Sequence, residues 1–138
     1  MIIINAENQI IGRLASYIAK KALLGEKIAV VNSEKAVISG NKQEILEKYK
    51  RKINIGIPLK GPYFPKKPEF ILKRTIRGML PYKQEKGRNA LENIKCFYGV
   101  PEKFQNKKYE DLNFHISKIT KTKYLSIYEI SKELGAKL

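Results

Sequence analysis

The sequence of 138 residues contains few of the side chains that most often carry enzyme chemistry. It has one cysteine (Cys96), one histidine (His115) and one aspartate (Asp111), and it has no tryptophan. A single cysteine excludes an intrachain disulfide framework and a zinc site built from several thiolates. A buried thiol in an apolar strand explains Cys96, and ordinary packing explains His115 better than catalysis. We therefore expect no catalytic residue, no metal site and no cofactor.

Two larger patterns are also missing, a glycine-rich nucleotide motif and a long apolar run. A dinucleotide-binding fold has Gly-x-Gly-x-x-Gly after its first strand, whereas only Gly12 is present here. We interpret Gly12 as a place where the start of a helix approaches the sheet closely. No apolar run comes near the roughly 18 residues that span a bilayer, and no basic leader precedes the first apolar residues. We expect neither a membrane partner nor a small-molecule substrate, and a cytosolic protein fits best.

Positive charge is what the sequence has in excess. Lys and Arg total 28 against 13 Asp and Glu, which gives a net charge of +15. Residues 50–88, here named the basic segment, hold twelve basic and two acidic residues and so carry two thirds of that net charge. A compact domain with this surplus repels itself unless it meets a polyanion, most commonly nucleic acid. The alternative is a solvated surface, but lysine-rich surfaces usually intersperse both signs.

Hydrophobic periodicity predicts a single α/β domain over residues 1–138. Apolar runs predict strands at residues 2–5, 27–32, 36–39 and 94–98. Apolar stripes and capping patterns predict helices at residues 12–24, 41–53 and 68–80, a short one at 89–93, and a last one that buries Ile127, Ile130 and Leu134. This alternation favours a three-layer α/β/α architecture with a small, largely parallel central sheet.

The basic segment interrupts this pattern with a Pro/Gly-rich loop and a helix. Residues 54–68 hold four of the six prolines and two glycines, which excludes a helix or an inner strand. In the helix that follows, Lys73, Arg74 and Arg77 fall within one arc, and Leu72, Ile76 and Met79 fall within the arc beside it. One face of this helix is therefore expected to pack, while the adjacent face presents only basic side chains. Residues 83–88 are predicted to be a second basic connection.

RNA is favoured over DNA as the partner of the basic segment. No helix-turn-helix, zinc-finger or basic-zipper pattern is present, and cations on an irregular loop suit irregular RNA. Tyr82 and Tyr63 could stack on unpaired bases, although packing is an equal alternative for Tyr63. Packing explains Phe64 and Phe70 better than stacking does. The candidate RNA-binding residues are Arg13, Arg51, Lys52, Lys60, Tyr63, Lys66, Lys67, Lys73, Arg74, Arg77, Tyr82, Lys83, Lys86 and Arg88.

Five short strings between residues 11 and 101 carry a family resemblance. They are Ile11-Gly12-Arg13-Leu14-Ala15-Ser16, Lys60-Gly61-Pro62, Arg77-Gly78-Met79-Leu80-Pro81, Lys86-Gly87-Arg88 and Tyr98-Gly99-Val100-Pro101. Together they resemble the universal large-subunit ribosomal protein L13 family, in its archaeal and eukaryotic form. Asn5 stands where many relatives have aspartate, and the His-Pro-His string of bacterial members is absent.

The resemblance implies a compact α/β/α domain on the ribosome, in the cytoplasm. It also implies contact with large-subunit ribosomal RNA and with neighbouring ribosomal proteins, support of RNA assembly, and no catalysis. Two other functions stay open from the residues alone. One is a general nucleic-acid-binding architectural protein, and the other is a nucleotide-dependent enzyme that uses the strand–helix start of the chain.

Overall fold

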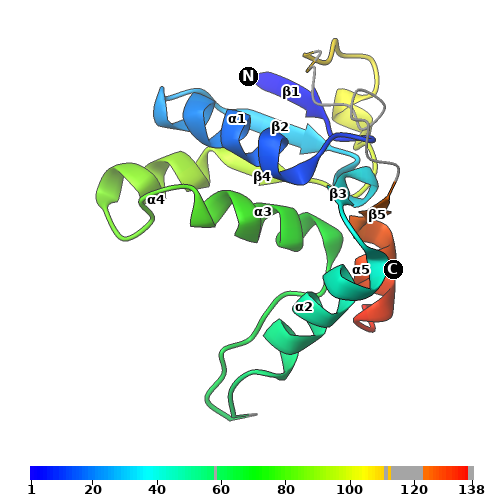
Figure 1. Ribbon diagram of the computed structural model, residues 1–138. Helices are drawn as coiled ribbons and strands as arrows, with labels where there is room; N and C mark the ends of the chain where they lie inside the picture. Colours follow the sequence, from blue (N-terminus) through cyan, green and yellow to red (C-terminus); the bar gives the residue numbers. More distant parts are fainter. Residues whose placement is uncertain (58, 111, 113–122, 137–138) are drawn as a thin grey trace.

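The computed structural model describes residues 1–57, 59–110, 112 and 123–136 (Figure 1). The elements follow one another as β1 (Ile2–Asn5), α1 (Ile11–Leu23), β2 (Ile28–Val31), the 3-10 turn η1 (Ser33–Lys35), β3 (Val37–Ser39), α2 (Lys42–Asn54), α3 (Pro68–Gly78), α4 (Glu85–Glu92), β4 (Ile94–Cys96), the 3-10 turn η2 (Glu102–Phe104), β5 (Tyr124–Ser126) and α5 (Ile127–Glu133).

The central sheet is small and parallel, as the alternation of strands and helices predicted. Its strand order is β1-β2-β4, and Ile28 of β2 lies opposite both Ile2 of β1 and Ile94 of β4. The apolar run of β2 is buried along its whole length because this central strand is covered on both faces. The α/β fold class is therefore confirmed.

One face of the sheet is covered by α1, α3 and α4 (Figure 1). Leu14, Ile18 and Ala22 recur at helical spacing along α1, and all three are buried against the sheet, as predicted. Leu72 and Ile76 of α3 are buried in the same core. Each such aliphatic side chain contributes roughly 1.5–3 kcal/mol when it is fully removed from water. This core fixes the position of α3, which carries much of the basic segment.

The opposite face of the sheet has a thinner cover. Ile3, Ala29 and Val31 point to this side and pack against Phe104 of η2, with Phe97 beside it. Within the described residues, the third layer is thus the segment 97–110 with its single 3-10 turn, where a longer helix would be the usual element.

A second, antiparallel pair of strands holds the end of the chain. β3 pairs with β5, with Ile38 opposite Leu125. The Ser126 Oγ accepts a hydrogen bond from the Glu129 backbone N–H at 3.3 Å, which confirms the predicted cap of the last helix. Ile127, Ile130 and Leu134 are buried, as predicted. The strand β5 itself was not predicted.

Three expectations about the helices are wrong in detail. α4 begins at Glu85, whereas the sequence predicted a basic connection up to residue 88. Gly87 lies inside α4, where the absence of a side chain lets the helix approach the Pro81 carbonyl. Met79 follows the last residue of α3 and is 43% exposed, so it is not buried with Leu72 and Ile76, although its sulfur lies 3.5 Å from the Ser16 Oγ of α1. A Cβ on Gly12 would meet nothing within 4 Å, so no close approach explains that glycine.

Candidate nucleic-acid interface

The basic segment starts on α2 and continues into a loop that extends away from the sheet before it returns to α3 (Figure 1). The N-terminus of α2 is capped by Asn41, whose Oδ1 accepts a hydrogen bond from the Gln43 N–H at 3.0 Å. At the tip of the loop, Ile57 and Gly61 exchange two backbone hydrogen bonds, of 3.2 and 2.9 Å. The loop is therefore a folded projection that is held at its tip and at both ends.

Phe64 fixes the part of the loop that returns toward the domain against α2 and α3. Its ring centroid lies 5.9 Å from that of Tyr49, and the Lys52 ammonium lies 5.3 Å from the Phe64 ring. The Arg74 guanidinium lies 5.7 Å from the same ring, and its Nη2 donates a hydrogen bond to the Tyr63 carbonyl oxygen at 3.3 Å. Phe64 thus packs the loop onto the domain, as predicted, and brings cations from two helices together.

The predicted basic face of α3 exists and carries an exposed aromatic ring. Lys73, Arg74 and Arg77 line one shallow hollow of about 260 Å³ together with Phe70. Phe70 is 51% exposed, so the expectation that it packs the loop is wrong. It lies three and four residues before Lys73 and Arg74, which places all three on one side of the helix. An open ring among cations suits a base flanked by phosphates.

Positive charges crowd one another between α2 and α3. A cavity of about 500 Å³ opens there, with Lys48, Lys52 and Arg74 among its lining residues. The pKa of Lys52 is lowered, first by burial of its ammonium group and then by Lys48 and Arg74. The pKa of Arg74 is lowered by burial and by Arg77. An anion placed here would relieve this repulsion.

Among the described residues, Glu44 is the one acid that lines this cavity, and it forms no salt bridge with the cations there. Within the described residues, no basic side chain of the basic segment forms a salt bridge, and the ion pair that is present joins Lys35 to Glu7 at 3.8 Å. The two acids inside the segment, Glu69 and Glu85, pair with none of its cations. The cations of the basic segment are therefore not paired in salt bridges with the carboxylates of the described residues.

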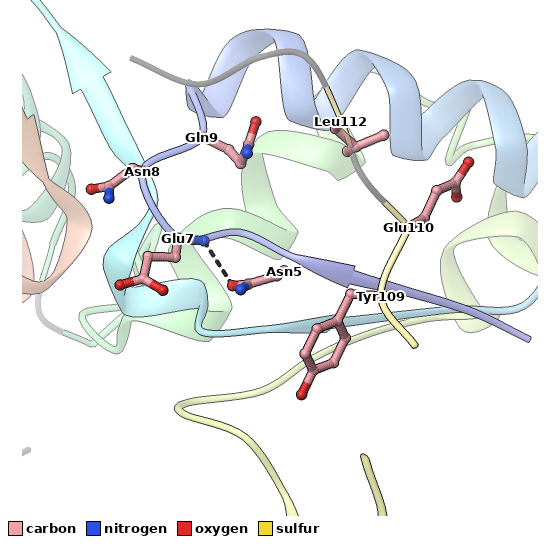
Figure 2. A pocket seen from close by; sticks show the side chains of 7 residues that line it. All are labelled: Asn5, Glu7, Asn8, Gln9, Tyr109, Glu110 and Leu112. Atoms are coloured by element: carbon pink, nitrogen blue, oxygen red, sulfur yellow. Dashed lines mark hydrogen bonds between the residues drawn. The ribbon is translucent and has the colours of Figure 1, made fainter. Parts of the chain in front are cut away.

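The carboxyl end of β1 forms a different kind of hollow, where α/β proteins often bind nucleotides (Figure 2). It measures about 330 Å³ and includes the carboxylates of Glu7 and Glu110. The Asn5 Oδ1 accepts a hydrogen bond from the Glu7 backbone N–H at 3.0 Å and is therefore already engaged. None of the seven described lining residues is basic, so a phosphate would meet two negative charges there. The geometry gives no support to a nucleotide-dependent enzyme.

Two further properties concern the described part of the chain. None of its helices is both long and apolar enough to cross a membrane. No three of its acidic, histidine and cysteine side chains gather in a way that could hold a metal ion. His115 and Asp111, considered above, lie outside the described residues.

Comparison with known sequences decides the family. Residues 1–103 match the family described as Ribosomal protein L13. The chain belongs to this family. It is 49% identical over 135 residues to "Large ribosomal subunit protein uL13" of Archaeoglobus fulgidus, across 96% of this chain and 86% of the relative. It is 47% identical over 141 residues to the protein of the same name from Methanococcus maripaludis, across 99% of each chain.

Membership of the L13 family confirms the resemblance inferred from the five strings. The chain is a structural protein of the large ribosomal subunit, and a ribosomal protein family is not an enzyme family. Its archaeal character agrees with relatives such as that of Methanococcoides burtonii, 42% identical over 138 residues and 99% of each chain. The predicted localisation, on the cytoplasmic ribosome, follows from the family.

The structure unites only some of the candidate residues of this L13 protein. Direct contacts or shared hollows link Lys52, Tyr63, Lys73, Arg74, Arg77 and Tyr82 around α3. The other candidates are exposed on α1, α2, the loop, the connection before α4 and α4 itself, with no contact that joins them to this group: Arg13, Arg51, Lys60, Lys66, Lys67, Lys83, Lys86 and Arg88. Their role stays a prediction.

Two residues of the group around α3 were missed by sequence reasoning. Lys48 lies just before the basic segment, but it precedes Lys52 by one helical turn and so shares its side of α2. Phe70 was assigned to packing, although its spacing from Lys73 and Arg74 placed it among cations. Helical spacing was the available signal in both cases. We name Lys48, Lys52, Phe70, Lys73, Arg74, Arg77 and Tyr82 the α3 cluster.

Proposed function

We propose that this L13 protein binds large-subunit ribosomal RNA through the α3 cluster and the exposed lysines of the adjoining loop, and thereby supports RNA assembly. The observation that carries the proposal is the set of cations in the basic segment that no carboxylate of the described chain neutralises. Each phosphate that meets such a cation releases condensed counterions and adds binding free energy. In this proposal residues 1–138 act as one domain.

The exposed aromatic rings give the proposal a second component. Tyr63, Phe70 and Tyr82 are 66%, 51% and 38% exposed, and each belongs to the basic segment. A ring beside a cation can stack on an unpaired base while the cation contacts the neighbouring phosphate. Paired DNA bases are closed to such stacking, so this arrangement favours RNA with unpaired nucleotides over duplex DNA.

The test reverses two exposed lysines of the loop and the partly buried Lys73 of α3. Lys66→Glu, Lys67→Glu and Lys73→Glu, combined in one variant, leave the packed Arg74 and Arg77 untouched. Binding of a large-subunit RNA fragment is measured across a salt series by fluorescence anisotropy, after circular dichroism has verified the fold. We expect a strong loss of affinity and a salt slope smaller by about 2–3, because each lost phosphate contact removes roughly 0.7–0.9 from it.

A control variant with the same net charge separates a local site from a general effect. Lys108→Glu, Lys123→Glu and Lys132→Glu reverse three exposed lysines outside the basic segment. This control should lose much less affinity than the first variant. An equal loss in both variants would show that net charge and not the basic segment carries binding. Duplex DNA that competes as well as structured RNA would instead favour a general nucleic-acid-binding protein.

A further inference from the structure

Three exposed tyrosines surround a hollow that lies outside the basic segment. Tyr98, Tyr124 and Tyr128 are 48%, 51% and 39% exposed and line a cavity of about 520 Å³. They come from three separate places, the loop after β4, the strand β5 and the helix α5. Tyr98 begins the fifth string of the family resemblance, which RNA binding by residues 50–88 leaves unexplained. We name this hollow the tyrosine pocket.

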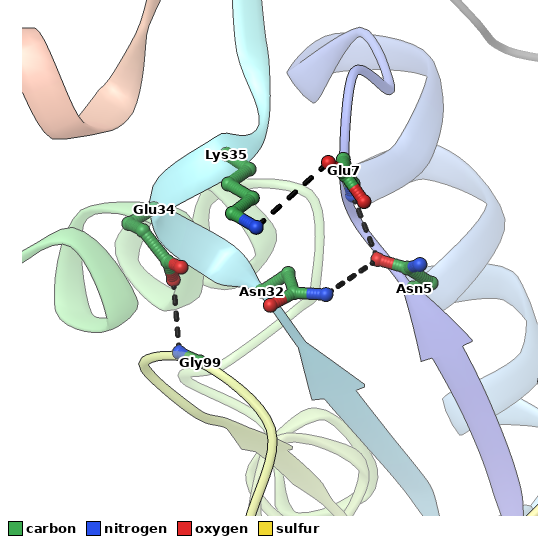
Figure 3. Close-up of polar contacts among 6 residues, drawn as sticks. All are labelled: Asn5, Glu7, Asn32, Glu34, Lys35 and Gly99. Carbon is green, nitrogen blue, oxygen red and sulfur yellow. Dashed lines mark hydrogen bonds and ion pairs between the residues drawn. The ribbon is translucent and has the colours of Figure 1, made fainter. Parts of the chain in front are cut away.

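The wall of the tyrosine pocket is held in place by polar contacts (Figure 3). The Glu34 Oε2 accepts a hydrogen bond from the Gly99 backbone N–H at 3.0 Å, which fixes the turn that follows Tyr98. The Lys35 ammonium lies 3.8 Å from the Glu7 carboxylate, so the cation that lines the pocket already has a partner. These contacts join the ends of β1, β2 and β4 into one rigid wall.

The charge of the tyrosine pocket is opposite to that of the rest of the molecule. The chain carries a net charge of +15, yet the pocket is lined by two carboxylates, Glu7 and Glu34, against the single cation of Lys35. Desolvation raises the pKa of the Tyr98 hydroxyl, and the negative charge of Glu34 adds to that rise. A phosphate would meet net negative charge here, whereas a cation would be attracted.

The aromatic rings of the pocket also lack the cations that cover other rings of this chain. Tyr82 has Arg77 at 4.8 Å and Phe104 has Lys103 at 5.0 Å, measured to the ring centroids. No lysine or arginine of the described residues lies over Tyr98, Tyr124 or Tyr128. Exposed tyrosines of this kind are enriched where proteins bind one another.

From the rings and the charges together, we propose that the tyrosine pocket binds an arginine-bearing segment of another protein. A guanidinium stacks on a tyrosine ring and offers its planar donor fork to a carboxylate, and the pocket provides both groups within one hollow. The favoured occupant is an extended basic arm, because an extended chain can present successive side chains to three rings. This site is separate from the RNA-binding surface proposed above and does not depend on it.

The first test measures the response of each tyrosine ring to a bound peptide by ¹⁹F NMR. The eight tyrosines are replaced with 3-fluorotyrosine, and their ¹⁹F resonances are assigned by single Tyr→Phe variants. The probe is a short unstructured peptide with two arginines, and its matched control has citrulline at both positions. At about 0.15 M salt, where repulsion by distant lysines is screened beyond roughly 8 Å, the arginine peptide should shift Tyr98, Tyr124 and Tyr128. The citrulline peptide should bind roughly tenfold more weakly.

The resonances of Tyr63 and Tyr82 serve as internal controls and should stay in place with the peptide. Equal shifts with both peptides, or no shift at the three pocket tyrosines, would overturn the proposal. Shifts caused by an RNA fragment instead of the peptide would assign the pocket to RNA. Tyr128→Ala should abolish most of the peptide affinity without changing RNA affinity, because Tyr128 lies on the surface of α5.

A second test uses opposite changes of charge at the ion pair. Glu7→Gln removes a carboxylate from the pocket and should lower its affinity for the arginine peptide severalfold. Lys35→Gln removes the competing cation and should raise the affinity for the arginine peptide. A phosphate-binding pocket would respond with the opposite signs, so the pair of variants identifies the charge of the occupant. Both side chains are about half exposed, at 46% and 51%, so neither change disturbs the core.

Discussion

The Arg77 guanidinium lies 4.8 Å from the centroid of the Tyr82 ring, so the last turn of α3 is joined to the connection that leads into α4. The contact orients Tyr82 beside the basic face of α3, while the ring stays 38% exposed. Arginine over an aromatic ring is an attractive arrangement of roughly 0.5–1 kcal/mol at an exposed site. The pair therefore places an aromatic ring and a cation side by side, as the proposed stacking on a nucleotide requires.

The first prediction concerns Tyr82. Tyr82→Ala should weaken binding of a large-subunit RNA fragment by about 1–3 kcal/mol, roughly 5- to 150-fold, because one stacking surface is lost. Tyr82→Phe keeps the ring and should remain close to the unmodified protein. Tyr124→Ala, at an exposed tyrosine outside the basic segment, is the control. Fluorescence anisotropy at constant salt measures all three, and an unaffected alanine variant would remove Tyr82 from the interface.

Much of the fold could be predicted because its signals are local. The stripe of Leu14, Ile18 and Ala22 determines which side of α1 faces the sheet, and the apolar run of β2 determines its central position. The cap at Ser126 is readable because the hydroxyl and the backbone donor it serves are three residues apart. Such features depend on neighbours within one helical turn or one strand.

The features that were missed depend on distant parts of the chain. β5 has three residues and no periodic pattern, and it exists because β3, far earlier in the sequence, pairs with it. Phe70 is 51% exposed, and its helical spacing places it beside Lys73 and Arg74, but that spacing does not show that the loop leaves the ring open. The tyrosine pocket likewise arises only when β5 and α5 approach the loop after β4. Charge density indicates a polyanion partner, but only the fold shows which rings stand beside the charges.

The second prediction concerns the cap of α5. Ser126→Ala removes the oxygen that accepts the Glu129 N–H, so the free energy of unfolding should fall by about 1 kcal/mol. Ser126→Asp should retain most of the stability, since aspartate caps equally well. Urea denaturation followed by circular dichroism measures the difference. As a control, Ser16→Ala should be near neutral, because the exposed Ser16 Oγ donates to the Gly12 carbonyl oxygen of its own helix and otherwise meets only the weak acceptor Met79 Sδ at 3.5 Å.

The third prediction concerns alkaline pH. Burial raises the pKa of the Cys96 thiol from 9.0 to about 12. Between these values the unfolded chain loses the thiol proton while the folded chain keeps it, so stability falls as pH rises through this window. The stability advantage of the unmodified protein over Cys96→Ala should therefore shrink by about 1–2 kcal/mol between about pH 8 and pH 10.5. Parallel stability curves for the two proteins would mean that the thiol titrates normally.

The last prediction concerns the close approach of α4 to the turn after α3. A Cβ on Gly87 would lie 1.9 Å from the Pro81 carbonyl oxygen and 2.2 Å from the carbonyl carbon. These are backbone atoms, so no side-chain rotation can relieve the overlap. Although alanine is the better helix former, Gly87→Ala should lower the free energy of unfolding by about 1–3 kcal/mol, as overpacking does. Thermal or urea denaturation measures the change.

Gly12→Ala is the matched control, because there the free energy of unfolding should change in the opposite direction. Gly12 also lies in a helix, but a Cβ there would meet nothing within 4 Å, so the variant should gain about 0.5–1 kcal/mol from reduced freedom of the unfolded chain. If Gly87→Ala stabilises as well, α4 does not pack on Pro81 as described. If Gly87→Ala lowers the stability as expected, the variant should also bind RNA more weakly. Lys86 and Arg88 flank Gly87 and would move with the displaced helix.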